Sequence, residues 1–388
     1  MEEQAAARRV LASGQFSSLS GPEVGRFERA WAEFQGTRHA IAVNTGTAAI
    51  HVALVAAGIG PGDEVVVTSH SFIGSVTPVV HAGAVPIFAD IDRRTFNLTA
   101  SSVEAALTPR TRAIVLVHLN GHPADPIAMA DLAGRKGLLL IEDCAQATGA
   151  RWDGRLVGTF GHAGAYSFWE DKIITTGGEG GMIVTDDDAL ARRARMVLNH
   201  GEAPTDENYS AGERLYFHET LGYNFRMTEL AGALGSVQLG RLPGYVERRR
   251  ELASALTERL AGVPGIVTPL EQEAATHAYY KYILLLDREV IAAPVEEVVA
   301  AIRAEGIPAT RRYPTPLHRQ PIFVDRRGFG DRHWPFPEEA ASPPNLPGAE
   351  GVAKDAIQVT VVNPSIGDAD IADAAAAITK VAAAFSRP

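Results

Sequence analysis

Residues 137–146, Gly-Leu-Leu-Leu-Ile-Glu-Asp-Cys-Ala-Gln, carry the clearest structural pattern in the chain. The run Leu138–Ile141 is short and wholly apolar, which is typical of a strand that is buried on both faces of a parallel sheet. Glu142 and Asp143 follow it directly. A carboxylate at the end of a buried strand is costly unless it meets a cation or a metal, so the same stretch also predicts a functional site.

Apolar runs of the same kind, rich in Val and Ile, recur on both sides of this stretch. We expect strands at His39–Val43, Glu64–Val67, Val85–Phe88, Ala113–Val117 and Met182–Thr185. Segments with helical spacing lie between them, at Thr47–Ala57, Ser71–Ala82, Ser101–Leu107, Pro126–Lys136 and Asp188–Leu198. Strands that alternate with helices predict parallel pairing, and therefore an α/β fold whose sheet is covered by helices.

The pattern changes in the second half of the chain. Residues 199–222 are polar and have no clear period, which indicates a long ordered or ligand-gated loop. Helices are expected at Thr228–Leu242 and Arg248–Leu260, and a smaller unit of strands and helices follows Pro264. We therefore expect an N-terminal arm at residues 1–20, a large domain at 21–240 and a small C-terminal domain at 241–388.

The composition fits a globular enzyme and argues against other classes. Of the 388 residues 46% are apolar and 21% charged, and 36 basic against 46 acidic residues give a net charge of −10. Such a chain is a poor candidate for binding a nucleic acid polymer or an anionic membrane. Cys144 is the single cysteine, which excludes an internal disulfide and a cysteine-cluster zinc site. Because neither a secretory signal nor an apolar run of roughly 18 residues is present, we expect a soluble, cytoplasmic protein.

A candidate phosphate site follows the first expected strand, at Asn44-Thr45-Gly46-Thr47-Ala48. Backbone N–H groups at a helix start, a glycine that permits close approach and a threonine hydroxyl together suit a phosphate group. An ordinary threonine-capped helix explains the same motif equally well.

Lys172 stands before a dense glycine run, Gly177-Gly178-Glu179-Gly180-Gly181, and has apolar neighbours. Desolvation lowers the pKa of an amine and would make Lys172 the nucleophile that a Schiff base requires. A lysine that caps a turn is an equal alternative. Phe72 offers an aromatic face for a planar cofactor, although a phenylalanine more often belongs to the core.

Together these residues predict a site for pyridoxal phosphate (PLP). They supply a phosphate cup, a carboxylate, an amine and an aromatic plate, which match the phosphate, the pyridinium nitrogen, the aldehyde and the ring of that cofactor. We expect no metal site. His118 and His122 have the spacing of metal ligands, but Pro123 is not compatible with a helix there.

Several segments of the chain also match, in order, the motifs of one enzyme family. They are Gly46-Thr47, Gly60-Pro61-Gly62-Asp63-Glu64-Val65, Glu142-Asp143-Cys144-Ala145-Gln146, Ser167-Phe168 with Lys172, Gly178-Glu179-Gly180-Gly181, Gly222-Tyr223-Asn224-Phe225-Arg226-Met227 and Tyr313-Pro314-Thr315-Pro316-Leu317-His318. From about residue 21 to residue 318 the chain resembles the DegT/DnrJ/EryC1/StrS aminotransferases. These are PLP enzymes of the aspartate-aminotransferase fold (fold type I) that aminate keto-sugars or ketocyclitols. The resemblance implies a large domain with a mainly parallel seven-stranded sheet and a smaller C-terminal α/β domain.

The resemblance implies a role for each matching residue. Lys172 would form the Schiff base with PLP and carry a proton between substrate and cofactor, while Asp143 would pair with the pyridine nitrogen. Gln146 would lie near the ring hydroxyl, and Phe72 would stack on the ring. The glycine run after Lys172 is one residue longer than the commoner form of the family, so the loop there would be shaped differently.

The remaining matches imply contacts with the phosphate, the substrate and a second subunit. Asn224 would reach the cofactor phosphate of a partner, which implies a homodimer. The residues that would hold the phosphate are Gly46, Thr47 and Ser167, and those that would line the substrate side are Tyr313 and His318.

The implied reaction transfers an amino group from an amino acid, L-glutamate by family resemblance, to a keto-sugar. An NDP-linked keto-deoxysugar is the leading acceptor, and Arg311 and Arg312 are candidates for the basic patch that its diphosphate needs. A ketocyclitol of the scyllo-inosose type is the close alternative, because the motif residues serve the cofactor and not the acceptor. A PLP-binding regulator without turnover is a further alternative, which the intact Lys172 disfavours. In the dehydratase branch a histidine replaces this lysine, so that chemistry is not expected.

Overall fold

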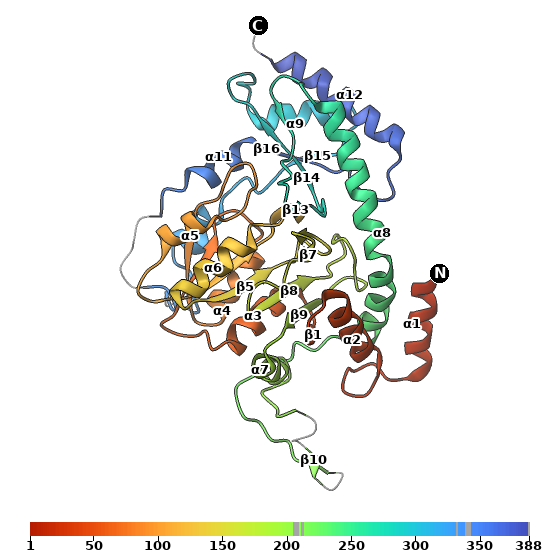
Figure 1. Ribbon diagram of the computed structural model, residues 1–388, viewed down its shortest axis with the longest axis vertical. Coiled ribbons are helices and arrows are strands. Elements are labelled where there is room, and N and C mark those ends of the chain that lie inside the picture. The colour runs from red at the N-terminus through yellow and green to blue at the C-terminus, as the bar shows by residue number, and fades with distance from the viewer. Residues whose placement is uncertain (205–208, 211–212, 331–332, 338–342, 387–388) are drawn as a thin grey trace.

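The computed structural model describes residues 1–204, 209–210, 213–330, 333–337 and 343–386. Its larger part is built on a seven-stranded sheet with the order β1-β9-β8-β5-β4-β2-β3 (Figure 1). The strands are β1 (His39–Val43), β2 (Glu64–Thr68), β3 (Val85–Ala89), β4 (Thr111–Val117), β5 (Leu139–Asp143), β8 (Ala163–Ser167) and β9 (Gly181–Thr185). Neighbours from β3 to β8 pair in parallel, and β9 is antiparallel to both β1 and β8. The prediction of a mainly parallel seven-stranded sheet is therefore confirmed.

Helices cover both faces of this sheet, and alternate strand residues contact opposite layers. Val65 and Val67 of β2 share a core with α3, α4 and α7, whereas Val66 between them packs with α5 and α6. The bounds are α3 (Gly46–Ala56), α4 (Thr77–His81), α5 (Ala100–Ala106), α6 (Pro126–Lys136) and α7 (Asp188–Leu198). Burial on both faces explains why these strands read as continuous apolar runs in the sequence.

The C-terminal part has an antiparallel four-stranded sheet of its own, in the order β12-β14-β16-β15. These strands are β12 (Ile266–Val267), β14 (Tyr282–Leu286), β15 (Ala309–Arg311) and β16 (Ala356–Val359). The helices of this half are α9 (Val295–Ala304), α10 (Pro321–Val324), α11 (Pro347–Asp355) and α12 (Asp368–Phe385). This part supplies one wall of the site described below.

Helix α8 (Glu229–Leu260) is continuous, although two helices were expected over its length. Pro243 lies inside it, between the two expected helices, and has no N–H to donate. Packing on both sides maintains the helix: Leu242 belongs to the core of the larger part, and Leu256 belongs to that of the C-terminal part. The expected domain boundary near residue 240 falls within this helix, and the division itself remains a proposal.

The N-terminal arm contains a helix, α1 (Glu2–Ser13), which lies along α8 (Figure 1). Ala6 and Val10 pack against Ala233, and Arg241 forms ion pairs with Glu2 and Glu3. Helix α2 (Glu23–Gln35) follows and also contacts α8. The arm is therefore attached to the larger part and is not a free extension.

Short strands complete the described chain. β6 (Arg151–Trp152), β7 (Arg155–Leu156) and β13 (Ala275–Thr276) form a three-stranded sheet, and β10 (Tyr209–Ser210) pairs with β11 (Glu213–Arg214). The β10–β11 pair projects from the body at the foot of Figure 1, within the segment expected as a long loop. No helix in the described ranges has the length and apolar character of a membrane span.

Candidate active site

A cavity of about 550 Å³ opens at the carboxyl ends of the central strands, where α/β sheets place their ligands. It brings together most of the residues predicted from the sequence. These are Gly46, Thr47, Phe72, Asp143, Gln146, Ser167, Lys172 and Tyr313. The C-terminal part contributes Tyr280, Lys281, Arg312 and Gln358 to the same lining.

The start of α3 forms a polar cup at one end of the cavity. Thr45 caps the helix, because its Oγ1 accepts a hydrogen bond from the N–H of Ala48 at 3.0 Å. A Cβ on Gly46 would lie 2.5 Å from the Cβ of Ser167, so only glycine lets the helix start approach β8 this closely. This approach brings the backbone N–H groups at the helix start near two hydroxyl groups that line the cavity, those of Thr47 and Ser167. The cup suits a phosphate group.

Asp143, the last residue of β5, is 2% exposed and keeps hydrogen-bonding capacity free. Its Oδ2 accepts from Ser75 Oγ at 2.7 Å and its Oδ1 from the N–H of Ala145 at 3.0 Å. Burial raises the pKa of Asp143, and the bonds from Ser75 and Ala145 oppose that rise without cancelling it. Each carboxylate oxygen can accept a further bond, so this group can meet a protonated ring nitrogen.

Lys172 lies in the turn that follows β8, where its backbone N–H donates to Trp169 O at 2.9 Å. Its Nζ is 4.7 Å from the centre of the Tyr280 ring. Burial lowers the pKa of Lys172 to about 8; Asp143 opposes this shift and Arg312 adds to it. The amine is therefore much closer to its neutral, nucleophilic form than an ordinary lysine.

The longer glycine run after Lys172 forms the loop that leads into β9. Gly177 and Gly178 have φ angles of 89° and 136°, which are positive and favour glycine. Gly178 also forms an isolated bridge with Trp169, which ties the loop back to the turn before Lys172. The extra residue is thus accommodated by left-handed backbone next to the lysine.

Gln146 has an orientation that its neighbours determine. Its Oε1 accepts from Arg312 Nη2 at 2.8 Å and from the N–H of Asn120 at 3.1 Å, and its Nε2 donates to Tyr313 Oη at 3.2 Å. Since Nε2 has two hydrogens and Gln146 lines the cavity, a second donor remains for a ligand there. Phe72 also lines the cavity and is 59% exposed, so a ring face is available for stacking.

The structure does not bring two of the predicted residues to this cavity. His318 is buried and lines a separate cavity of about 620 Å³ beside β3, with its Nε2 3.4 Å from Glu350 Oε1. The role of His318 on the substrate side stays a prediction. Asn224 is exposed and lies outside the lining of the cavity.

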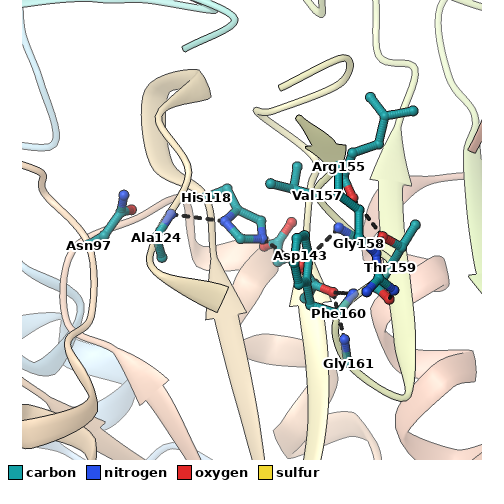
Figure 2. A network of polar contacts seen from close by, with 12 residues as sticks. Asn97, His118, Ala124, Asp143, Arg155, Val157, Gly158, Thr159, Phe160 and Gly161 are labelled. Carbon is teal, nitrogen blue, oxygen red and sulfur yellow. Dashed lines mark hydrogen bonds and ion pairs between the residues drawn. The ribbon is translucent and has the colours of Figure 1, made fainter. Parts of the chain in front are cut away.

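One group of potential metal ligands lies beside the site, where ligand atoms of His118, Glu142 and Cys144 are within 4.8 Å of one another. Figure 2 shows His118 and the loop at Gly158 in this region. His118 Nδ1 accepts from the N–H of Ala124 at 3.0 Å, so its Nε2 carries the proton that it donates to Glu142 at 3.0 Å. Burial raises the pKa of the Cys144 thiol, which keeps it protonated. These contacts describe a hydrogen-bonded interior, and we propose no metal here.

The family model of the DegT/DnrJ/EryC1/StrS aminotransferase family matches residues 1–362. This chain belongs to that family. The resemblance seen in the sequence is therefore confirmed, and so is the expectation of a PLP-dependent transaminase.

Known relatives of this DegT/DnrJ/EryC1/StrS aminotransferase extend over most of its length. The dTDP-3-amino-3,4,6-trideoxy-alpha-D-glucose transaminase of Streptomyces venezuelae is 37% identical over 360 residues, which cover 93% of this chain and 87% of that protein. A Geobacillus stearothermophilus protein named pleiotropic regulatory protein is 39% identical over 334 residues, covering 86% of this chain and 85% of that one. The crystal structure of S. venezuelae DesV in complex with a ketimine intermediate has a TM-score of 0.86 and 35% identity, and the match covers 98% of this chain and 94% of DesV.

Sequence reasoning missed several residues of this DegT/DnrJ/EryC1/StrS aminotransferase that line the cavity. Ser75 was hidden within an expected helix, although it follows Phe72 by three residues and shares its loop. Tyr280 and Lys281 directly precede β14, in the unit of strands and helices that was expected after Pro264. Their one sequence signal is a lysine between tyrosines at the start of an apolar run, an unusual position for a charged residue.

Proposed function

We propose that this protein uses PLP to transfer an amino group from an amino acid, L-glutamate in the first instance, to a keto-sugar linked to a nucleoside diphosphate. The observation that carries the proposal is that Lys172, Asp143 and the polar cup at the start of α3 line one cavity. A pKa near 8 for the lysine and a buried carboxylate with free acceptor capacity are what such a transaminase needs. We also propose that the protein acts in the cytoplasm.

The residues present fit the cofactor. When bound, PLP supplies the electron sink that stabilises negative charge at the carbon that loses its proton. Asp143 would keep the ring nitrogen protonated, Gln146 Nε2 would donate to the ring hydroxyl and Phe72 would cover the ring. The phosphate would be held by Gly46, Thr47 and Ser167. The close approach of α3 to β8, which a Cβ on Gly46 would prevent, supports this assignment.

Lys172 would also serve as the acid and base of the reaction. Its Nζ would remove the proton from the α-carbon of the donor and deliver a proton to the carbon that becomes aminated in the acceptor. A pKa of about 8 lets the amine take up and release a proton near neutral pH. Tyr280, whose ring lies under Nζ, would restrict the positions that the amine can adopt.

The comparisons support a sugar acceptor over the ketocyclitol. The S. venezuelae relative is named as the transaminase of a dTDP-linked aminosugar, and its similarity covers 93% of this chain. The regulator reading is not favoured, because Lys172 and Asp143 are both intact and line the same cavity.

A second copy of the chain would complete the site. Asn224 is exposed and does not reach the cavity of its own subunit. The segment that leads to it exposes large apolar side chains: Leu221 is 90% exposed, and Phe217 and Tyr223 are also exposed. We propose that this surface contacts a partner and that Asn224 then donates to the cofactor phosphate bound by the other subunit.

The function is tested first on the purified protein. It should carry PLP, absorb visible light and, after borohydride reduction, retain the cofactor on a peptide that contains Lys172. Glutamate should then yield 2-oxoglutarate, and keto-sugar nucleotides should be aminated in preference to scyllo-inosose. Lys172→Ala should abolish the transfer, while Lys380→Ala, at an exposed lysine paired with Glu305, should leave it unchanged. A wild-type protein that binds PLP but responds to no amino donor would contradict the proposal.

The shared site is tested by mixing two variants. Lys172→Ala and Asn224→Ala subunits are each expected to form defective homodimers. In a mixed dimer, the subunit that keeps Lys172 receives an intact Asn224 from its partner, so one working site is restored. If both residues act within one subunit, mixing restores nothing, and the partner role of Asn224 is wrong.

A further inference from the structure

Arg312 is a buried cation that lines the cavity. It follows β15 directly and is 8% exposed. Its guanidinium donates to three neutral amide oxygens: Asn120 Oδ1 at 2.9 Å, Gln358 Oε1 at 3.1 Å and Gln146 Oε1 at 2.8 Å. Its Cζ also lies 4.1 Å from the centre of the Tyr313 ring. The side chain is therefore held in one position.

The positive charge of Arg312 is not neutralised by an acidic side chain. Within the described ranges no carboxylate forms an ion pair with Arg312, and the three acceptors of its guanidinium are amide oxygens. A buried cation without a counter-ion is costly, and the cost is recovered when an anion binds. Three of the five N–H groups of the guanidinium are used by the amides, so donors remain for that anion.

The position of Arg312 indicates which anion it binds. Its partner Gln146 is the residue expected at the ring hydroxyl, and that hydroxyl is next to the aldehyde of PLP. Arg312 and Lys172 also lie against the same Tyr280 ring, with Cζ at 6.0 Å and Nζ at 4.7 Å from its centre. A group bound by Arg312 would therefore lie close to the reacting atoms.

The diphosphate of a sugar nucleotide does not suit this position. A sugar ring separates the diphosphate from a keto carbon, so the diphosphate must lie farther from Lys172 than the reacting carbon does. In an amino acid, by contrast, a carboxylate is attached directly to the reacting carbon. Arg311, the other arginine considered for a diphosphate, pairs with Glu296 and donates to Ala353 O, outside the cavity lining.

We propose that Arg312 binds a carboxylate of the amino-acid donor, and so makes the cavity selective for amino acids in the first half of the reaction. This inference rests on the proposed function. The planar guanidinium matches a carboxylate by two parallel hydrogen bonds, which the single charge of a lysine does not reproduce.

Lys281 stands beside this position as a second cation of the lining. It is paired with Asp171 at 2.7 Å, and its Nζ lies 4.5 Å from the centre of the Tyr280 ring. The Asp171 side chain is half exposed, so water can replace it as the partner of Lys281 at little cost. Unlike Arg312, Lys281 already has a carboxylate partner, which is why the proposal concerns the arginine.

The test combines an enzyme variant with a change in the donor. Holoenzyme of wild type and Arg312→Met is assayed with L-glutamate, with 4-aminobutyrate, which lacks the α-carboxylate, and with L-2-aminobutyrate, which lacks the side-chain carboxylate. We expect kcat/KM for L-glutamate to fall about 10- to 150-fold in the variant, the range for a lost hydrogen bond to a charged group. For the donor that lacks the carboxylate bound by Arg312, kcat/KM should change by no more than about 2-fold.

Two further measurements separate binding from positioning. Binding of glutarate, an unreactive dicarboxylate, should weaken in Arg312→Met by calorimetry, while glutaramide should bind wild type and variant alike. Arg312→Lys should recover part of the loss, and Arg311→Met is the matched control that should change neither donor selectivity nor glutarate binding.

An equal loss for all three donors, with unchanged glutarate binding, would overturn the proposal and leave Arg312 as a residue that only positions Gln146. A higher KM for the sugar nucleotide with no change for glutamate would overturn it too, because the anion would then be the diphosphate. If wild type reacts with no amino donor, the proposed function fails, whereas the glutarate measurement still decides whether Arg312 binds a carboxylate.

Discussion

Glu142 and Asp143 are neighbours at the end of β5, and the protein surrounds their carboxylates in opposite ways. Glu142 is fully buried and accepts four hydrogen bonds: from His118 Nε2 at 3.0 Å and from the N–H groups of Gly158, Phe160 and Gly161 at 2.8, 2.6 and 2.8 Å. Figure 2 shows how the loop of these three residues turns its backbone toward one point. Asp143 accepts two bonds and lines the cavity.

The pKa shifts follow the number of donors. Burial raises the pKa of Glu142, but the bonds from His118 and the loop outweigh it, and the pKa lies below its ordinary value. Burial raises the pKa of Asp143 too, and there the two donors do not outweigh it. A buried acid with its acceptor capacity filled supports the fold, whereas one with capacity left over is available to a ligand.

Asp143→Asn should show the largest difference between the two acids, because it should lower turnover and not stability. Loss of the negative charge should lower turnover about 100- to 1000-fold, the range for removing one electrostatic contact from a catalytic site. The free energy of unfolding of the apoprotein should stay the same or rise, because the amide has no charge to desolvate. Steady-state kinetics and urea unfolding measure the two effects. Turnover within tenfold of wild type would contradict the role of Asp143.

Glu142→Gln should show the reverse pattern. The amide nitrogen would face backbone donors or leave His118 without its acceptor, so the free energy of unfolding should fall by about 3 kcal/mol. The folded fraction should keep turnover of the same order as wild type. Denaturant unfolding measures the loss. A variant as stable as wild type would show that the four bonds do not stabilise the fold.

Ser75→Ala should widen the difference in pKa between Asp143 and Glu142. The hydroxyl bond favours the ionised carboxylate, so its removal raises the pKa of Asp143, and the acid limb of the kcat profile should shift to higher pH. Turnover on that limb should fall about tenfold. Ser75→Thr retains the hydroxyl and should restore the profile. An unshifted acid limb in Ser75→Ala would exclude Ser75 as a positioning residue.

The smallest expected effect is on acid stability of the apoprotein. The pKa of Glu142 lies below 4.5 in the folded state, so the stability it contributes is present above that pH and is lost as the pH falls below it. Asp143 has a raised pKa and acts in the opposite sense, because its ionised form opposes folding until it is protonated. Unfolding free energies measured against pH should therefore fall less steeply for Glu142→Gln than for wild type, and more steeply for Asp143→Asn. Equal slopes would contradict the assigned shifts.

Much of this site could be predicted from the sequence because it lies on local strand–loop patterns. Asp143 ends an apolar run, Gly46 opens a helix and Lys172 precedes a glycine run, and each pattern is complete within about ten residues. The difference between Glu142 and Asp143 could not be predicted, because it depends on donors from elsewhere. Gly158, which donates to Glu142, follows the two acids in the sequence, whereas Ser75, which donates to Asp143, precedes them.

The C-terminal wall shows the same limit of sequence reasoning. Arg312 was named only as a candidate for a basic patch, since nothing near it in the chain indicates that it meets Asn120 and Gln146. Two helices were expected where α8 is continuous, and packing on both sides overrides the low helix propensity of Pro243 between them. His318 matched a motif, but its buried side chain belongs to a different cavity.

The continuity of α8 has a consequence for protein engineering. Lys172 and Arg312 line the same cavity, and they come from the two parts of the chain that this helix joins. A chimera that exchanges the C-terminal part between relatives would be cut most safely in the loop after Leu260, where the helix has ended. A junction near residue 240 would combine two halves of one helix from different parents. Leu242 from one parent would then pack against the core of the larger part from the other parent.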